Sequence, residues 1–152
     1  MITETLILEQ TDRKIFQLKR GGRIIVPPTG WLYDIRQSLG MSLRQAGKRT
    51  GMTAQSFSET EKREKNGNIT VKVLREVGAG LGLKLVYGFI PEAGSLEKMV
   101  EARALELARE IVKRTSVNMK LEGQELTPSR LKRAVKDKAK EICNEMPRYL
   151  WD

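Results

Sequence analysis

The sequence predicts a mainly α-helical fold with a single β-strand, on three observations. Apolar residues recur every three or four positions along most of the chain, which is the spacing of one face of a helix. Ser or Thr precedes most of these periodic stretches, as expected of residues that cap helices. One stretch, "LKLVYGFI" at 83–90, is instead β-branched and aromatic, and Gly82 and Pro91 bound it. With 152 residues, the chain fits one domain, or a small domain with an appendage.

The N-terminal region, residues 1–28, is predicted to hold one helix and a basic extended arm. Its helix is expected over about residues 4–18, with an apolar face formed by Leu8, Thr11, Ile15 and Leu18. The following "KRGGRIIVPP" contains two glycines and a Pro-Pro pair, which enforce an extended connector. Arg20 and Arg23 in this arm are candidates for contacts with a phosphate backbone. A solvated basic linker explains the same residues equally well.

Residues 29–82 are predicted to form four short helices around one core, because helices of this length are not stable alone. A Ser or Thr is expected to cap each helix at its N-terminus: Thr29, Ser42, Thr53 and Thr70. Gln45 lies three residues after Ser42, which completes a capping box. The inward faces of the first and fourth helices are predicted to be Trp31, Ile35 and Leu39, and Val73, Leu74, Val77 and Leu81.

Residues 83–152 are predicted to contain the strand and two longer helices. A lone strand leaves its backbone groups unpaired, so the strand Leu83–Ile90 is expected to pair with the same strand of a second copy, giving a homodimer. Ser95 is expected to cap the first long helix, and Thr127-Pro128 to begin the second. One face of the second helix is basic: Arg130, Lys132, Arg133, Lys136, Lys138 and Lys140. The aromatic residues of the terminal "PRYLWD" are expected to pack back onto the body.

The composition argues for a polyanionic partner and against an enzyme. The chain carries 28 Lys and Arg against 19 Asp and Glu, for a net charge of +9. It has no histidine, which excludes Ser–His–Asp and Cys–His catalysis and most catalytic zinc sites. The segment Gly47–Thr50 lacks the upstream glycine of a phosphate-binding loop, and Gly78, Gly80 and Gly82 end a helical pattern. Carboxylate or lysine chemistry stays formally open, but the prediction is a non-enzyme with no cofactor and no metal.

Targeting signals and cysteine usage predict a cytoplasmic protein. No apolar run approaches the roughly 18 residues of a membrane span, and the N-terminus lacks the order of a signal peptide. Cys143 is the single cysteine, so no internal disulfide forms, as is typical of a reducing compartment.

The segment "RQAGKRTGMTAQSFSETEK", residues 44–62, predicts a helix-turn-helix motif. Two capped helices flank a turn at Gly51, Gly47 lies where they cross, and Phe57 is the inward anchor of the second helix. Short polar side chains let a helix enter the major groove of double-stranded DNA closely, and Gln can pair with both edge atoms of adenine. The candidate DNA-binding residues are Ser42, Arg44, Thr53, Ala54, Gln55, Ser56, Ser58, Glu59, Lys62 and Arg63. The alternative is an ordinary helical hairpin with a polar face.

Residues 30–82 resemble the Cro/XRE class of helix-turn-helix proteins. More narrowly, "PPTGWLYDIRQSLGMSLRQAGKRTGMTAQSFSETEK", "LKLVYGFIP", "SLEKMVEARALELARE" and "PRYLWD" are similar to the mobile mystery protein A family, over nearly the whole chain beyond about residue 20. Family members are usually encoded beside a Fic-domain protein. The resemblance therefore implies a sequence-specific transcriptional repressor that serves as the antitoxin or regulator of a Fic-type toxin.

The chain departs from the class at three positions. Ala46 and Thr50 stand where the class usually has large apolar residues, and Gly47 stands where it usually has alanine. Glycine in place of alanine costs about 1 kcal/mol of helix propensity. The motif is therefore expected to be less rigid than usual, although Leu43, Met52 and Phe57 remain to anchor it.

The resemblance also implies a second, inhibitory role. Antitoxins of Fic enzymes often carry a helix reading Ser/Thr-x-x-x-Glu-Gly/Asn, whose glutamate blocks the nucleotide site of the toxin. The nearest match is "NMKLEG", with Asn118 in place of the hydroxyl residue, followed by Glu122 and Gly123. The main rival function is accordingly an antitoxin that acts by protein–protein inhibition and uses its helix-turn-helix for assembly.

Overall fold

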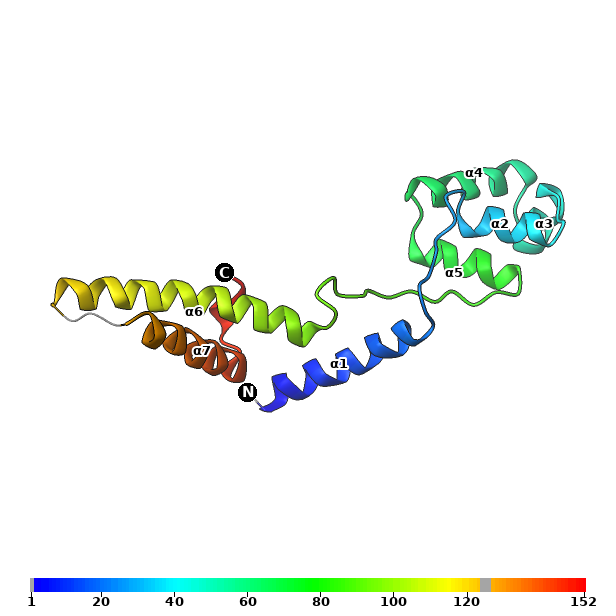
Figure 1. Cartoon of the computed structure of the whole chain (residues 1–152). Coiled ribbons are helices and arrows are strands. Elements are labelled where there is room, and N and C mark those ends of the chain that lie inside the picture. The colour runs from blue at the N-terminus through cyan, green and yellow to red at the C-terminus, as the bar shows by residue number, and fades with distance from the viewer. Residues whose placement is uncertain (1, 124–126) are drawn as a thin grey trace. The chain divides into compact units, whose positions relative to one another are not determined.

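A computed structural model describes residues 2–123 and 127–152, and these residues are mainly α-helical, as the sequence predicted. Figure 1 shows the helices in chain order. They are α1 (Ile2–Arg20), α2 (Trp31–Ser38), α3 (Leu43–Thr50), α4 (Ala54–Asn66), α5 (Val71–Gly80), α6 (Leu96–Leu121) and α7 (Pro128–Glu145), followed by the 3-10 turn η1 (Arg148–Trp151).

The chain forms two compact units, each with its own core. The central unit consists of residues 23–87 and contains α2 to α5. The terminal unit consists of the described residues of 1–22 and 88–152, and contains α1, α6, α7 and η1. Residues 1–28 were predicted to form a region of their own, whereas α1 belongs to the unit of the C-terminal helices.

The four short helices of the central unit share one core, as their length required. Its buried residues come from all of these helices and from the end of α5: Leu32, Ala46, Phe57, Val77 and Leu81. Phe57 is fully buried and is the inward anchor of α4. Val73 and Leu74 pack against this core and are partly buried, so the predicted stripe of α5 is confirmed.

Local capping was predicted well for five helices. Ser42 and Gln45 form the complete capping box of α3, with bonds of 3.1 Å from Gln45 N to Ser42 Oγ and 2.8 Å from Ser42 N to Gln45 Oε1. A Ser or Thr hydroxyl likewise accepts a backbone N–H at the start of the other four, the capping residues being Thr53, Thr70, Ser95 and Thr127. In each case the cap and its partner lie within one helical turn, so sequence alone identifies them.

The start and the buried face of α2 were predicted wrongly. Thr29 does not cap it: the Thr29 hydroxyl donates to the Asp34 carboxylate, and Gly30, at φ 88°, is the N-cap. The inward residues are Leu32 and Arg36, whereas Trp31 and Leu39 of the predicted apolar face are 43% and 54% exposed. Polar contacts with α4, described below, set the rotation of this helix and override its apolar pattern.

The predicted strand over 83–90 is absent from the structure, whose described residues contain no strand. Residues 84–90 make no backbone hydrogen bond, and Val86 and Phe89 are 71% and 87% exposed. A strand is defined by its ladder, and this single chain supplies no second strand with which to build one.

The basic arm is also shorter than predicted, because α1 continues to Arg20. Lys19 and Arg20 lie in its last turn, where positive charge is favourable beside the carbonyl end of the helix dipole. The Lys19 ammonium donates to the carbonyl of Gly94, within the terminal unit. Of the two arginines proposed to lie along a backbone, only Arg23 therefore belongs to the extended connector.

In the terminal unit, α7 runs back along α6 (Figure 1). Its core consists of Val100, Ala104, Ala108, Ile142 and Leu150. The C-terminal segment does pack back onto this core, but through Leu150, which is 1% exposed, while the aromatic Tyr149 and Trp151 stay exposed. Arg103 of α6 fixes the segment by donating to the carbonyls of Leu150 and Asp152, at 2.7 Å each.

Asp12 attaches α1 to the start of α6. Its two carboxylate oxygens accept the backbone N–H groups of Leu96 at 2.8 Å and Glu97 at 3.1 Å. A negative charge at the positive end of a helix dipole is a favourable placement. Leu8 packs against the core of the terminal unit and gives this attachment an apolar component.

Candidate nucleic-acid interface

Helices α3 and α4 are joined by a tight turn that depends on two glycines. Gly51 ends α3 in the left-handed conformation at φ 69°, and Met52 N donates to Gly47 O at 2.7 Å. A Cβ atom on Gly47 would lie 2.5 Å from the carbonyl oxygen of Met52 and 3.0 Å from that of Thr53. The chain can therefore approach this close to α3 only because residue 47 is glycine, as the sequence analysis inferred.

The residues predicted to contact DNA divide into an outward stripe and a supporting set. The side chains of Gln55, Ser56, Glu59, Lys62 and Arg63 are all exposed on α4. Spacings of four and three residues place Gln55, Glu59 and Lys62 one above another on the same face. The supporting residues stabilise the motif itself: Ser42 caps α3 and Thr53 caps α4, while Ala54 and Ser58 are half-buried. Arg44 is exposed in the first turn of α3.

The other predicted site residues do not join this stripe within the central unit. Arg20 ends α1 and belongs to the terminal unit, whereas Arg23 begins the central unit. Asn118, Glu122 and Gly123 lie at the C-terminal end of α6, where all three are exposed. Glu122 is the C-cap residue, its N–H donates to Asn118 O at 3.1 Å, and Gly123 has φ 79°. The "NMKLEG" segment is thus a helix end.

The outward surface of α3 and α4 is strongly basic, although the segment 42–66 also contains acids. Its bases are all exposed: Arg44, Lys48, Arg49, Lys62, Arg63 and Lys65. Its acids are Glu59, Glu61 and Glu64, and the last two turn toward α2. Glu59 is therefore the one exposed carboxylate of this segment.

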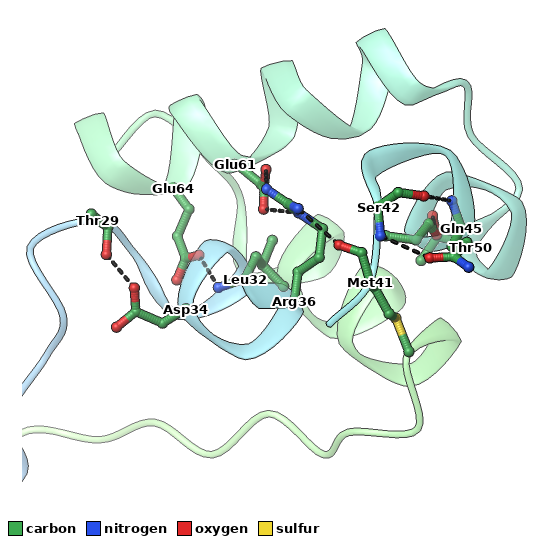
Figure 2. Close-up of polar contacts among 11 residues, drawn as sticks. Thr29, Leu32, Asp34, Arg36, Met41, Ser42, Gln45, Thr50, Glu61 and Glu64 are labelled. Carbon is green, nitrogen blue, oxygen red and sulfur yellow. Dashed lines mark hydrogen bonds and ion pairs between the residues drawn. The ribbon is translucent and has the colours of Figure 1, made fainter. Parts of the chain in front are cut away.

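Glu61 forms a buried ion pair with Arg36 of α2 (Figure 2). The guanidinium binds both carboxylate oxygens, with Nε to Oε2 at 2.9 Å and Nη2 to Oε1 at 3.2 Å. The remaining Nη1 donates to Met41 O at 3.0 Å, and the Tyr33 ring centroid lies 5.4 Å from the guanidinium carbon. The two side chains are 8% and 7% exposed. In the described part of the chain, no buried side-chain nitrogen or oxygen lacks a hydrogen-bond partner.

Glu64 caps α2 from a different helix. Its oxygens accept the N–H group of Trp31 at 2.9 Å and that of Leu32 at 2.8 Å, and Figure 2 shows the contact with Leu32. A carboxylate at this helix start satisfies backbone donors that Thr29 was predicted to satisfy. The two carboxylates together fix α2 on α4 and remove negative charge from the outward surface.

Sequence reasoning missed Arg36, Glu61 and Glu64, yet a signal was present. Glu61 and Glu64 follow Phe57 at spacings of four and seven residues, so all three share one face of α4. Acids that continue the apolar face of a helix are unusual, because carboxylates are rarely buried unless they are paired. The spacing of these acids therefore predicts that each carboxylate has a hydrogen-bond or ion-pair partner on the inward side of α4.

No protein-family model, no curated protein and no solved structure matches the chain. Within residues 2–123 and 127–152, no group of three or more Cys, Asp and Glu side chains is arranged to hold a metal ion. None of the helices in these ranges combines the length and apolar character that crossing a bilayer requires.

Proposed function

We propose that the protein is a sequence-specific DNA-binding repressor, in which α3 and α4 form a helix-turn-helix of the Cro/XRE type and α4 enters the major groove. One observation carries the proposal: α4 exposes a polar and basic stripe, while two of the three acids of the segment are held inward by α2. In an ordinary helical hairpin that binds no polyanion, turning the carboxylates inward brings no advantage in binding. A helix that approaches DNA phosphates binds better when its carboxylates are turned inward, because each exposed carboxylate would repel the phosphate backbone of the DNA.

The positions of the exposed residues along α4 support two kinds of DNA contact, one to base edges and one to backbone phosphates. Gln55 lies in the first turn, where a recognition helix reaches base edges, and its amide can pair with adenine. Lys62 and Arg63 lie two turns further on, where their charges suit backbone phosphates. Glu59, between them, either accepts a hydrogen bond from cytosine or disfavours wrong sites by repulsion.

Gln55→Ala is expected to weaken binding to the operator by about 1–3 kcal/mol and to leave binding to random DNA nearly unchanged. Lys62→Ala is the matched comparison, because it removes a charge from the same stripe. It should weaken binding to both DNAs about equally and reduce the salt slope by roughly one unit. Operator fragments selected from random DNA by the purified protein, followed by binding curves at two salt concentrations, measure both effects. Equal losses on operator and random DNA with Gln55→Ala would show that α4 does not read bases.

The repressor acts as a homodimer that pairs residues 83–90 of two copies. This segment is largely apolar, its residues 84–90 make no backbone hydrogen bond in the single chain, and Val86 and Phe89 are exposed. A second copy can therefore supply the missing ladder. Two-fold symmetry makes the new ladder antiparallel, and a dimer presents two recognition helices to a palindromic operator.

Val86→Pro is expected to give a monomer with weakened DNA binding, because proline removes a ladder donor. Light scattering at micromolar concentration distinguishes the two states. Val86→Thr is a control that keeps the N–H and the β-branch. A wild-type protein that scatters as a monomer contradicts the strand-paired dimer, and it leaves the DNA contacts of a single α4 to be judged by the Gln55 experiment.

The resemblance to the mobile mystery protein A family adds a Fic-domain protein as the partner that this regulator would serve. The exposed position of Glu122 at the end of α6 leaves that carboxylate accessible to such a partner. If inhibition of the partner were the main function, α3 and α4 would bind DNA weakly and without sequence preference. The binding curves for Gln55→Ala therefore also decide between these two functions.

A further inference from the structure

The terminal unit contains an apolar groove that the proposed DNA binding does not use. It has a volume of about 900 Å³ and lies between α6 and α7, with the first half of α1 along one side. Its apolar lining consists of Leu8, Val100, Leu105, Val135, Ala139, Cys143 and Met146. Its charged lining consists of Glu97, Glu101, Arg109, Lys132, Lys136 and Lys140. We call this the α6–α7 groove.

The shape of the α6–α7 groove fits a helix. Its lining runs along α6 from Glu97 to Arg109 and along α7 from Lys132 to Asn144, which is about 18 Å on each helix at 1.5 Å per residue. Lining residues recur on α7 at spacings of three and four, so the apolar floor is continuous along this length. A helix of about 12 residues would cover it from end to end.

Most charges of the groove are segregated along its length, and Lys140 lies between the two groups, one turn before Cys143. Because α7 runs back along α6, Arg109 lies toward the end of the groove that holds Lys132 and Lys136. Glu97 and Glu101 lie toward the other end, with Cys143. Glu97, Glu101 and Cys143 all line the groove. Burial raises the pKa of the Cys143 thiol, and the charges of Glu101 and Glu97 raise it further.

This distribution separates a helix from a small amphiphile as the occupant. A single anionic headgroup needs one compact group of bases. Lys132, Lys136 and Lys140 instead follow one another at four-residue intervals, roughly 6 Å apart along α7. Acidic residues at four-residue intervals on a partner helix match that spacing, and an apolar face alongside them matches the floor.

We propose that the α6–α7 groove binds an amphipathic helix of another protein, with acidic residues at the lysine end and a basic residue at the end of Glu97 and Glu101. The apolar face of that helix covers Val135, Ala139 and Cys143. The lysines supply orientation and rate of association, and the floor supplies most of the affinity. This docking is independent of the proposed DNA binding, since every lining residue belongs to the terminal unit.

The test uses the full-length protein and two designed fluorescein-labelled peptides of about 15 residues, long enough to span the groove. Both carry leucines along one helical face. The first has glutamates beside the leucines in one half and lysines in the other, and the second has lysines throughout. In fluorescence anisotropy titrations, the wild-type protein is expected to bind the first peptide about tenfold more tightly than the second.

Charge reversal on α7 distinguishes the groove from the general basicity of the protein. Lys132→Glu/Lys136→Glu should weaken binding of the first peptide about tenfold or more, and strengthen binding of the all-lysine peptide. Arg130→Glu/Arg133→Glu makes the same change in net charge on the same helix, at residues outside the groove lining. This control should leave both affinities nearly unchanged. Equal effects of the two double variants overturn the proposal.

Cys143, the single cysteine, reports directly on occupancy of the floor. A saturating amount of the unlabelled first peptide is expected to slow its alkylation by N-ethylmaleimide several-fold, in the wild type and in the control variant. Unchanged alkylation overturns the proposal. Two other outcomes also overturn the proposal. Protection of Cys143 from alkylation by decanoate but not by the peptide assigns the groove to a small amphiphile. Protection of Cys143 that rises with protein concentration alone assigns the groove to a second copy of the protein.

Discussion

Arg36→Met is expected to lower the free energy of unfolding by about 3–5 kcal/mol, the largest effect of any single change considered for this protein. The substitution keeps the length of the side chain but leaves the Glu61 carboxylate 7% exposed and without its cation. Removing one member of a buried pair costs the desolvation of the other, which a similar change at the surface does not. Denaturant unfolding followed by circular dichroism measures the loss.

Two further variants separate the buried charge from the loss of packing. The double variant Arg36→Met/Glu61→Leu removes both charges, so most of the lost stability should return. Lys138→Met breaks the solvent-exposed pair of Lys138 with Glu141 and should change the unfolding midpoint little. If the double variant were as unstable as Arg36→Met alone, the cost would lie in packing or in the lost bond to Met41 O rather than in the unpaired carboxylate.

Contacts between residues close in the sequence could be predicted for this fold, whereas contacts between residues far apart in the sequence could not. The capping box of Ser42 and Gln45 closes within three residues, and the sequence identified it completely. The cap of α2 comes from Glu64, 32 residues from Leu32, and the sequence offered Thr29 instead because it was the nearest hydroxyl. Residues 83–90 show the limit of the approach, since strand-forming composition does not supply a strand with which to pair.

The α4 stripe was predictable for a related reason. Once Phe57 is assigned to the core, the 3.6-residue period fixes Gln55, Glu59 and Lys62 as outward, and all three are exposed. The same period also turns Glu61 inward, where a sequence-based reading rarely places an acid. The predicted inward face of α2 was wrong for the complementary reason. Its buried residue Arg36 is charged, so the pattern of apolar residues alone indicated a different rotation of the helix.

Gly47→Ala and Gly78→Ala are expected to change stability in opposite directions, and to differ by about 3 kcal/mol. Both glycines are buried within helices, so each substitution gains about 1 kcal/mol of helix propensity. A Cβ on Gly78 meets its nearest atom, Leu83 O, at 3.7 Å, which is ordinary contact, and this variant should be more stable than wild type. A Cβ on Gly47 would lie 2.5 Å from Met52 O.

The Gly47 contact cannot be relieved by rotating a side chain, because both of its nearest partners are backbone carbonyl groups. The turn must move away from α3, and Thr53, which caps α4, moves with it. Gly47→Ala should therefore lose about 2 kcal/mol of stability and also bind DNA more weakly, whereas Gly78→Ala should bind DNA as wild type does. Denaturant unfolding and DNA titrations of the two variants side by side measure both effects. If both substitutions stabilise equally, the turn has room for a methyl group and the close approach of α3 and α4 does not position the recognition helix.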